Sequence, residues 1–160
     1  MTQHRRHLVS AYVQDVPGVT IRIAMVFARR GYNIESFVGS ETITPGFSTI
    51  NIVASGDAKV LNLIIDQLNR LVNVVEAKEV EPADMLIREL ALIKISLPAQ
   101  HRTEAVMIAQ SAGCNVLEIH SDYMNLECTG PSETIDGVLT IFAEFGIQAV
   151  VRTGKVFLPR

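Results

Sequence analysis

Residues Asp15–Ser36 read DVPGVTIRIAMVFARRGYNIES, and this stretch decides the fold because it joins a strand end, a tight turn and a helix start. The preceding segment, Leu8–Val13, has the alternation of a strand. Pro17 fixes one turn dihedral, and Gly18 permits a close approach of another group to the backbone. The stretch therefore predicts a sharp corner that leads directly from a strand into a helix.

The corner has the chemistry to hold an amino acid. The first amides of the helix, those of Gly18, Val19 and Thr20, have no partner within it and lie at the positive end of its dipole, where a carboxylate binds well. Asp15 stands beside them as an anion that could meet an ammonium group. A turn that merely caps the helix explains the same residues, and from this motif alone that turn is the favoured interpretation.

Composition limits the possible functions. The chain has 160 residues, 48% of them hydrophobic, and a formal net charge of −3, which predicts a soluble globular protein of one ordinary domain or two small ones. Lys and Arg are dispersed, so nucleic acid is not expected as a partner. Apolar runs are too short to cross a membrane, and no signal core precedes the first strand. We expect a cytoplasmic protein, or a plastid protein if a transit peptide is missing here.

No catalytic or metal site is predicted. Cys114 and Cys128 lack a CxxC companion and are expected to be reduced core residues. The histidines fall in separate elements without ligand spacing: His4, His7, His101 and His120. A phosphate-binding glycine loop and a nucleophile elbow are both absent from the sequence.

The two halves of the chain repeat one order of elements, βαββαβ. The first half predicts strands at Leu8–Val13, Ile34–Thr42, Phe47–Ala54 and Val74–Val80, with helices at Val19–Arg30 and Ala58–Leu71. The second half predicts strands at Arg88–Leu97, Asn115–His120, Tyr123–Thr129 and Ile147–Arg152, with helices at Thr103–Ala112 and Ser132–Phe145. The fold class is therefore α+β, with two ferredoxin-like sandwiches in domains 1–81 and 85–160.

The first helix is apolar on two sides. Besides the core positions Val19, Ile23, Val26 and Phe27, it has a second apolar surface, which consists of Ile21, Ala24, Met25 and Ala28. A helix apolar almost all round should be covered on both sides. Either a loop of the same chain or a second copy of the chain could provide that cover.

Several segments resemble one family, the regulatory small subunit of acetolactate synthase, also called acetohydroxyacid synthase. The resemblance rests on Pro17-Gly18-Val19 followed by FARRGYNIES at Phe27–Ser36, on QLNRLVNV at Gln67–Val74, and on RELALIK at Arg88–Lys94. Phe145–Ile147 and Arg152–Lys155 resemble the closing strand of the family. Many members have different residues at Ile21 and Met25, which puts the packing of the first helix and effector binding in question.

The resemblance implies a non-catalytic protein whose N-terminal half, 1–81, is an ACT domain that binds an effector and dimerises. It implies binding to the catalytic large subunit of acetolactate synthase, activation of that subunit, and feedback inhibition by valine or another branched-chain amino acid. Thiamine diphosphate, magnesium and FAD would belong to the catalytic subunit and none of them to this chain. The family's effector site lies between two copies; the matching positions here are Asp15, Gly18, Val19 and Thr20 of one copy and Asn33 and Ile34 of the other.

Two other functions fit parts of the sequence. A stand-alone ACT-type amino-acid sensor would have the same first half, but the second half resembles the small subunits instead. A small hydrolase on the same sandwich would need an arginine in an anion-binding loop and an asparagine that positions water. Arg29, Arg30 and Asn33 are close in sequence, yet arginines at a helix end can simply complement the helix dipole.

Overall fold

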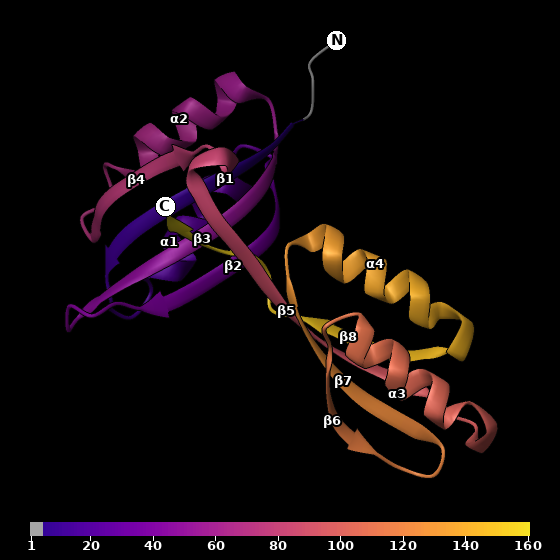
Figure 1. The fold of residues 1–160 in the computed structure, drawn as a ribbon. Helices are drawn as coiled ribbons and strands as arrows, with labels where there is room; N and C mark the ends of the chain where they lie inside the picture. The colour runs from indigo at the N-terminus through magenta and orange to yellow at the C-terminus, as the bar shows by residue number, and fades with distance from the viewer. Residues whose placement is uncertain (1–4) are drawn as a thin grey trace. The chain divides into compact units, whose positions relative to one another are not determined.

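The computed structural model describes residues 5–160 and shows an α+β protein of two compact units, each with two α-helices on one face of an antiparallel sheet (Figure 1). The first unit runs through Leu86 and also contains Lys155–Arg160. The second unit is Ile87–Gly154. The fold class predicted from the sequence is confirmed.

The first unit follows the βαββαβ order. Its elements are β1 (Arg5–Gln14), α1 (Val19–Ala28), β2 (Asn33–Glu41), β3 (Phe47–Gly56), α2 (Ala58–Leu68) and β4 (Val74–Val80). The strand order in the sheet is β2-β3-β1-β4, so β2 and β4 are its edges. The split βαβ arrangement puts both helices on one face.

The second unit repeats this order. Its elements are β5 (Met85–Ser96), α3 (Arg102–Ser111), β6 (Asn115–Ile119), β7 (Tyr123–Gly130), α4 (Ser132–Phe142) and β8 (Ile147–Arg152). The strand order is β6-β7-β5-β8, and a last strand, β9 (Val156–Pro159), pairs with β5. Three short 3₁₀ turns complete the description: Pro82–Asp84, Ala99–His101 and Ala143–Phe145.

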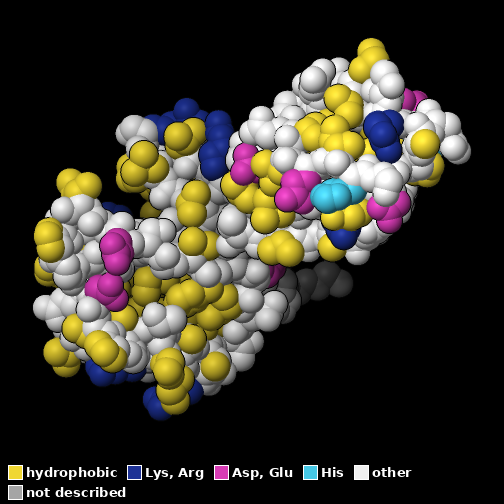
Figure 2. Space-filling model, turned by 90° about the horizontal axis from the view of Figure 1, so that it is seen from below, with side chains coloured by type: hydrophobic (Ala, Val, Ile, Leu, Met, Phe, Trp, Pro, Cys, Tyr) yellow, Lys and Arg dark blue, Asp and Glu magenta, His cyan; other side chains and the backbone are white. Residues whose placement is uncertain are grey.

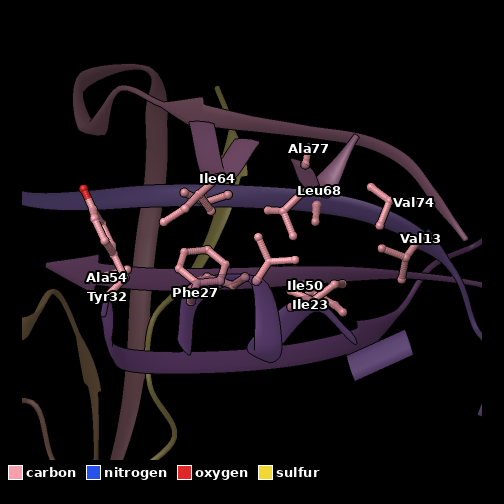
Figure 3. Close-up of a cluster of buried hydrophobic side chains, with 14 of the residues drawn as sticks. Val13, Ile23, Phe27, Tyr32, Ile50, Ala54, Ile64, Leu68, Val74 and Ala77 are labelled. Carbon is pink, nitrogen blue, oxygen red and sulfur yellow. The ribbon is translucent and has the colours of Figure 1, made fainter. Parts of the chain in front are cut away.

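The core of the first unit lies between its sheet and its two helices. Alternate residues of β1 point to the helices, and Val13 packs in a cluster with Ile23 and Phe27 of α1 and with Ile64 and Leu68 of α2 (Figure 3). Each large apolar side chain that is fully buried in this way stabilises the fold by about 1.5–3 kcal/mol. These contacts fix α1 against the sheet and thereby place the corner that precedes it.

The second core contains both cysteines. Cys114 and Cys128 are buried, unpaired thiols in the cluster formed by β5, β7, α3 and α4, which confirms the sequence prediction. On α4 the buried positions are Ile135, Val138 and Phe142, with helical spacing.

The four α-helices of residues 5–160 each end one to three residues before the predicted position. The sequence carried the first helix to Arg30, but α1 ends at Ala28 and leads into a turn in which Gly31 has a φ of 67°. Such a left-handed residue stops a helix. At the start of α2 the carboxylate of Asp57 accepts a hydrogen bond from the Lys59 amide at 2.8 Å, as expected for an N-cap.

Candidate functional site

The predicted corner between β1 and α1 is present. Gly18 occupies the position before the helix with φ 87° and ψ −4°, a left-handed conformation that glycine adopts without strain. The Asp15 amide donates to the Gly46 carbonyl at 2.9 Å, so the corner is attached to the turn of the β2–β3 hairpin. The backbone at the start of α1 is therefore held from two sides.

Most of the first helical amides are open. The Val19 amide donates to the Val16 carbonyl at 3.2 Å, so it is already used within the turn. Those of Gly18, Thr20 and Ile21 make no hydrogen bond within residues 5–160. The structure thus offers three polarised N–H groups to an anion, two of them on residues that the sequence had singled out.

A cation that the sequence reasoning missed lies at the same corner. Arg22 donates from Nη1 to Oδ1 of Asn73 at 2.8 Å, and Asn73 donates in turn to Oε1 of Gln14 at 3.0 Å. A Cβ added to Gly18 would lie 3.9 Å from Nη2 of Arg22. A cation in the first turn is unfavourable beside the positive end of the helix dipole, and a bound anion would offset this. The position of Arg22 in the first turn was therefore a signal in the sequence for an anion site.

Asp15 is the anionic counterpart of this group. Its side chain is exposed and forms no ion pair with any described residue. Open amides and Arg22 on one side, with the free Asp15 carboxylate on the other, match the carboxylate and ammonium of an amino acid in sign.

Asn33 and Ile34 lie far from this corner in the same chain. On β3, Phe47 pairs with Gln14, whereas Ser55, eight residues further along the strand, pairs with Asn33. Eight residues of extended chain span about 26 Å. Figure 3 shows the same separation, with Val13 at one end of the core and Tyr32 at the other.

The predicted site residues therefore form two separate half-sites. The first comprises Asp15, Gly18, Val19 and Thr20, and the second comprises Asn33, which is exposed, and Ile34, which packs partly against the core. A single amino acid is only a few ångströms long and cannot touch both halves of one chain. If these residues bind one ligand, the second half must come from another copy.

The second apolar surface of α1 is not covered by the described chain. Ile21 is 66% exposed and Met25 is 45% exposed. Figure 2 shows, without residue labels, that hydrophobic side chains reach the surface on one face of the molecule. No loop within residues 5–160 provides the cover that the sequence left open. The surface lies directly beside the open amides, since Ile21 belongs to both.

Other candidate residues have structural roles. Arg30 donates from Nε to Oε1 of Gln67 at 3.2 Å, and Arg152 forms ion pairs with Glu89 and Asp136. His7 is buried and bonded to Glu79 and to the Gly56 carbonyl. His4 lies outside the described residues.

Within residues 5–160, no group of three or more His, Cys, Asp or Glu side chains is arranged to hold a metal ion. None of the helices described there is long and apolar enough to span a membrane.

Known families match both units. Residues 9–76 match the family described as the AHAS small subunit-like ACT domain, and residues 88–160 match the family described as the small subunit of acetolactate synthase. The two matches together extend over most of the chain; the first lies within the first unit, and the second covers nearly all of the second unit together with Lys155–Arg160 of the first.

Individual relatives agree with the family matches. The probable acetolactate synthase small subunit of Methanothermobacter thermautotrophicus is 37% identical over 155 residues, which are 96% of this chain and 92% of that protein. The chloroplastic acetolactate synthase small subunit 2 of Arabidopsis thaliana is 35% identical, over 98% of this chain and 32% of that protein. The crystal structure of the acetolactate synthase small subunit from Thermotoga maritima has a TM-score of 0.89 and 31% identity, and covers 98% of both chains.

Proposed function

The chain belongs to the acetolactate synthase small-subunit family, and from this premise we propose that it is a regulatory subunit without catalytic activity of its own. In this role it binds the catalytic large subunit, raises its activity, and makes it sensitive to a branched-chain amino acid, chiefly valine. The family matches in both halves of the chain support a subunit of this kind over a stand-alone ACT-type sensor.

The observation that carries the effector proposal is the division of the site into two halves. One half combines open amides with Arg22 and Asp15, and the other, about 26 Å away along the sheet, presents Asn33 and Ile34. Two copies related by a twofold axis can bring unlike halves together, twice per dimer. The proposed effector therefore sits between chains and is sensitive to their relative orientation.

Each residue has a physical role in this proposal. The amides of Gly18 and Thr20 receive the carboxylate of the effector, and Asp15 receives its ammonium. Asn33 from the second copy adds an amide hydrogen bond, and Ile34 contributes to the slot for a branched side chain. One methylene in an apolar pocket changes the binding free energy by about 1–3 kcal/mol, so discrimination between valine, leucine and isoleucine should be modest.

Regulation follows from a shift in population. An amino acid that bridges two chains stabilises the arrangement in which both halves meet, and this arrangement supports the catalytic subunit less well than the alternative. A coupling free energy of about 1–3 kcal/mol gives inhibition by several-fold or more. Thiamine diphosphate, magnesium and FAD belong to the catalytic subunit, which carries out the chemistry.

We also propose that the chain works in the compartment of its catalytic partner. That compartment is the cytoplasm, or a plastid if this chain resembles the chloroplastic relative from Arabidopsis thaliana in this respect.

The site is tested by titrating valine into the complex reconstituted with the catalytic subunit, with wild-type protein and with Gly18→Asp. The added carboxylate would stand among the open amides and repel the carboxylate of the effector, so inhibition by valine should be lost. Gly113→Asp is the matched control, because Gly113 is also exposed, has a left-handed φ of 71°, and has no atom within 4 Å of an added Cβ.

Equal inhibition of the wild-type and Gly18→Asp complexes would remove this corner from the effector site. The role as a subunit is tested separately by co-purification with the thiamine-dependent enzyme. A protein that binds valine but never associates with that enzyme would instead be a stand-alone sensor.

A further inference from the structure

A row of side chains on the outer face of the first sheet is buried although no helix lies on that face. The register aligns Ser36 of β2, Val53 of β3, Leu8 of β1 and Val80 of β4 across the sheet. These positions alternate along their strands with core residues such as Val9, so their side chains point away from the helices. Val53 is nevertheless only 2% exposed, and Leu8 and Val80 are also buried.

The end of the chain supplies the cover. The Lys155 amide donates to Oγ of Ser36 at 2.9 Å, at one edge of the sheet. The Arg160 amide donates to the Asp84 carbonyl at 3.0 Å, just beyond the other edge strand, β4. The segment between these two bonds therefore has to cross the row.

Lengths agree with this path. Crossing from β2 to β4 takes three interstrand steps, about 14 Å, and the five residue steps from Lys155 to Arg160 reach about 16 Å. In Figure 3 the olive C-terminal strand runs across the direction of β1 and β3. β9 pairs with β5, whose first two residues, Met85 and Leu86, belong to the same unit.

Burial along β9 has the pattern of a strand with one side against a surface. Phe157 is 8% exposed, whereas Val156 and Leu158, its two neighbours, are 38% and 65% exposed. Phe157 thus anchors the middle of the segment while its neighbours face outward.

The chain is also fixed immediately before this segment. The Thr153 amide donates to the Leu90 carbonyl at 3.0 Å, and Oγ1 of Thr153 accepts a hydrogen bond from the Leu90 amide at 3.1 Å.

We propose that Lys155–Arg160 is a strap that holds the β2 edge of the first unit and thereby keeps the second half-site in place. Ser36 lies two residues from Ile34, beyond a bulge in β2, so the strap holds the strand that carries this half-site. The effect on a ligand rests on the proposed function, because β2 contributes to an effector site only if that site is real. Ser36 is accordingly a positioning residue that acts through the strap.

The strap is tested first by hydrogen exchange of the full-length protein. Phe157→Ala should speed exchange of the β2 amides about tenfold by releasing the edge. Leu158→Ala is the matched control on the exposed side of the same strand and should leave β2 unchanged. Ser36→Ala is a milder variant that keeps the fold, and Ser36→Thr should restore wild-type exchange because it retains the hydroxyl.

The role of the strap at the proposed site is tested by calorimetry with the same variants. Phe157→Ala and Ser36→Ala should weaken valine binding several-fold, whereas Leu158→Ala should keep the wild-type affinity. Equal β2 exchange in Phe157→Ala and Leu158→Ala would overturn the strap, and unchanged valine affinity despite faster exchange would overturn its role at the site. A wild-type protein that binds no valine would overturn the proposed function, while the exchange comparison would still decide whether the strap exists.

Discussion

Two buried side chains hold their protons more tightly in the folded protein than in the unfolded chain. Burial, and after it the neighbouring Cys128, raises the pKa of Cys114 to about 12. Burial, followed by the carboxylates of Asp57 and Glu79, raises the pKa of Tyr32, whose hydroxyl donates to the Asp57 carbonyl. Both groups are neutral when protonated, so the folded state favours the neutral form.

These shifts predict a loss of stability at alkaline pH. A folded-state pKa above the unfolded one contributes stability that is complete below the unfolded value, near 9 for Cys114, and that is lost as pH rises toward the folded value. From Cys114 alone, the free energy of unfolding should fall by up to about 1.4 kcal/mol per pH unit above that point. Urea denaturation under reducing conditions from pH 8 to about 10.5 measures the slope.

Cys114→Ala isolates the effect. The smaller side chain packs less well, which lowers the free energy of unfolding equally at every pH. Removal of the thiol makes the fall of that free energy with pH shallower above about pH 9. Tyr32 remains and begins to contribute above its ordinary value near 10. Parallel curves for the variant and the wild type would show that the Cys114 thiol does not titrate differently on folding.

Single residues could be predicted from the sequence where their partners are local. The turn at Gly18 and the cap at Asp57 each depend on neighbours within a few residues, so the sequence indicates them directly. Arg22 was missed because its partner, Asn73, is 51 positions away along the chain. Only the folded sheet and helix bring such a pair together.

At the scale of elements, one arginine joins three segments of the second unit. Arg152, at the end of β8, donates to both carboxylate oxygens of Glu89 on β5, at 2.8 and 3.2 Å, and to Asp136 on α4 at 2.6 Å. The Glu89 side chain is only 5% exposed. These carboxylates raise the pKa of Arg152, with the hydrogen bonds to Glu89 as the largest cause.

Removing this arginine should destabilise the second unit. Arg152→Ala leaves the Glu89 carboxylate buried without its main cation, at a cost of about 3 kcal/mol, the low end for a buried pair because the guanidinium is partly exposed. Arg88→Ala is the control, since Arg88 is exposed and its side chain donates to the neighbouring Ile87 carbonyl, and its effect should stay within about 0.5 kcal/mol. Denaturation curves that shift equally in the two variants would contradict this role.

The elements with clear periodicity were predicted to within a few residues, whereas β9 was not predicted at all. Val156–Pro159 is too short to show a period, and its pairing with β5 is a tertiary contact. The sequence boundaries placed residues 155–160 in the second domain, but the contacts of this segment lie in the first unit. Where a four-residue strand goes is decided by the surface that it covers.

At the scale of the whole molecule, the candidate residues can bind one amino acid together only if a second copy supplies half of them. The sequence supplied the candidate residues through a family resemblance, but it could not show that they lie at opposite ends of one sheet. That separation follows from the register of β3 with both β1 and β2. The exposed apolar surface of α1, next to the open amides, is the face that we expect the second copy to cover.

Met25→Glu tests this arrangement. A charge in a covered apolar surface should weaken the dimer about a hundredfold or more, since both the apolar burial is lost and a carboxylate is desolvated. The measurements are the mass in solution by sedimentation and valine binding by calorimetry. The control is Leu63→Glu on α2, because Leu63 is 49% exposed, nearly the same as the 45% of Met25.

The two measurements should change together. If the half-sites complete each other only between chains, Met25→Glu should lose its dimer and its valine affinity in parallel, while Leu63→Glu keeps both. A Met25→Glu protein that stays dimeric would show that the α1 face is not the interface. A monomer that still binds valine would be more damaging, because one chain would then hold the effector with residues about 26 Å from half of the proposed site.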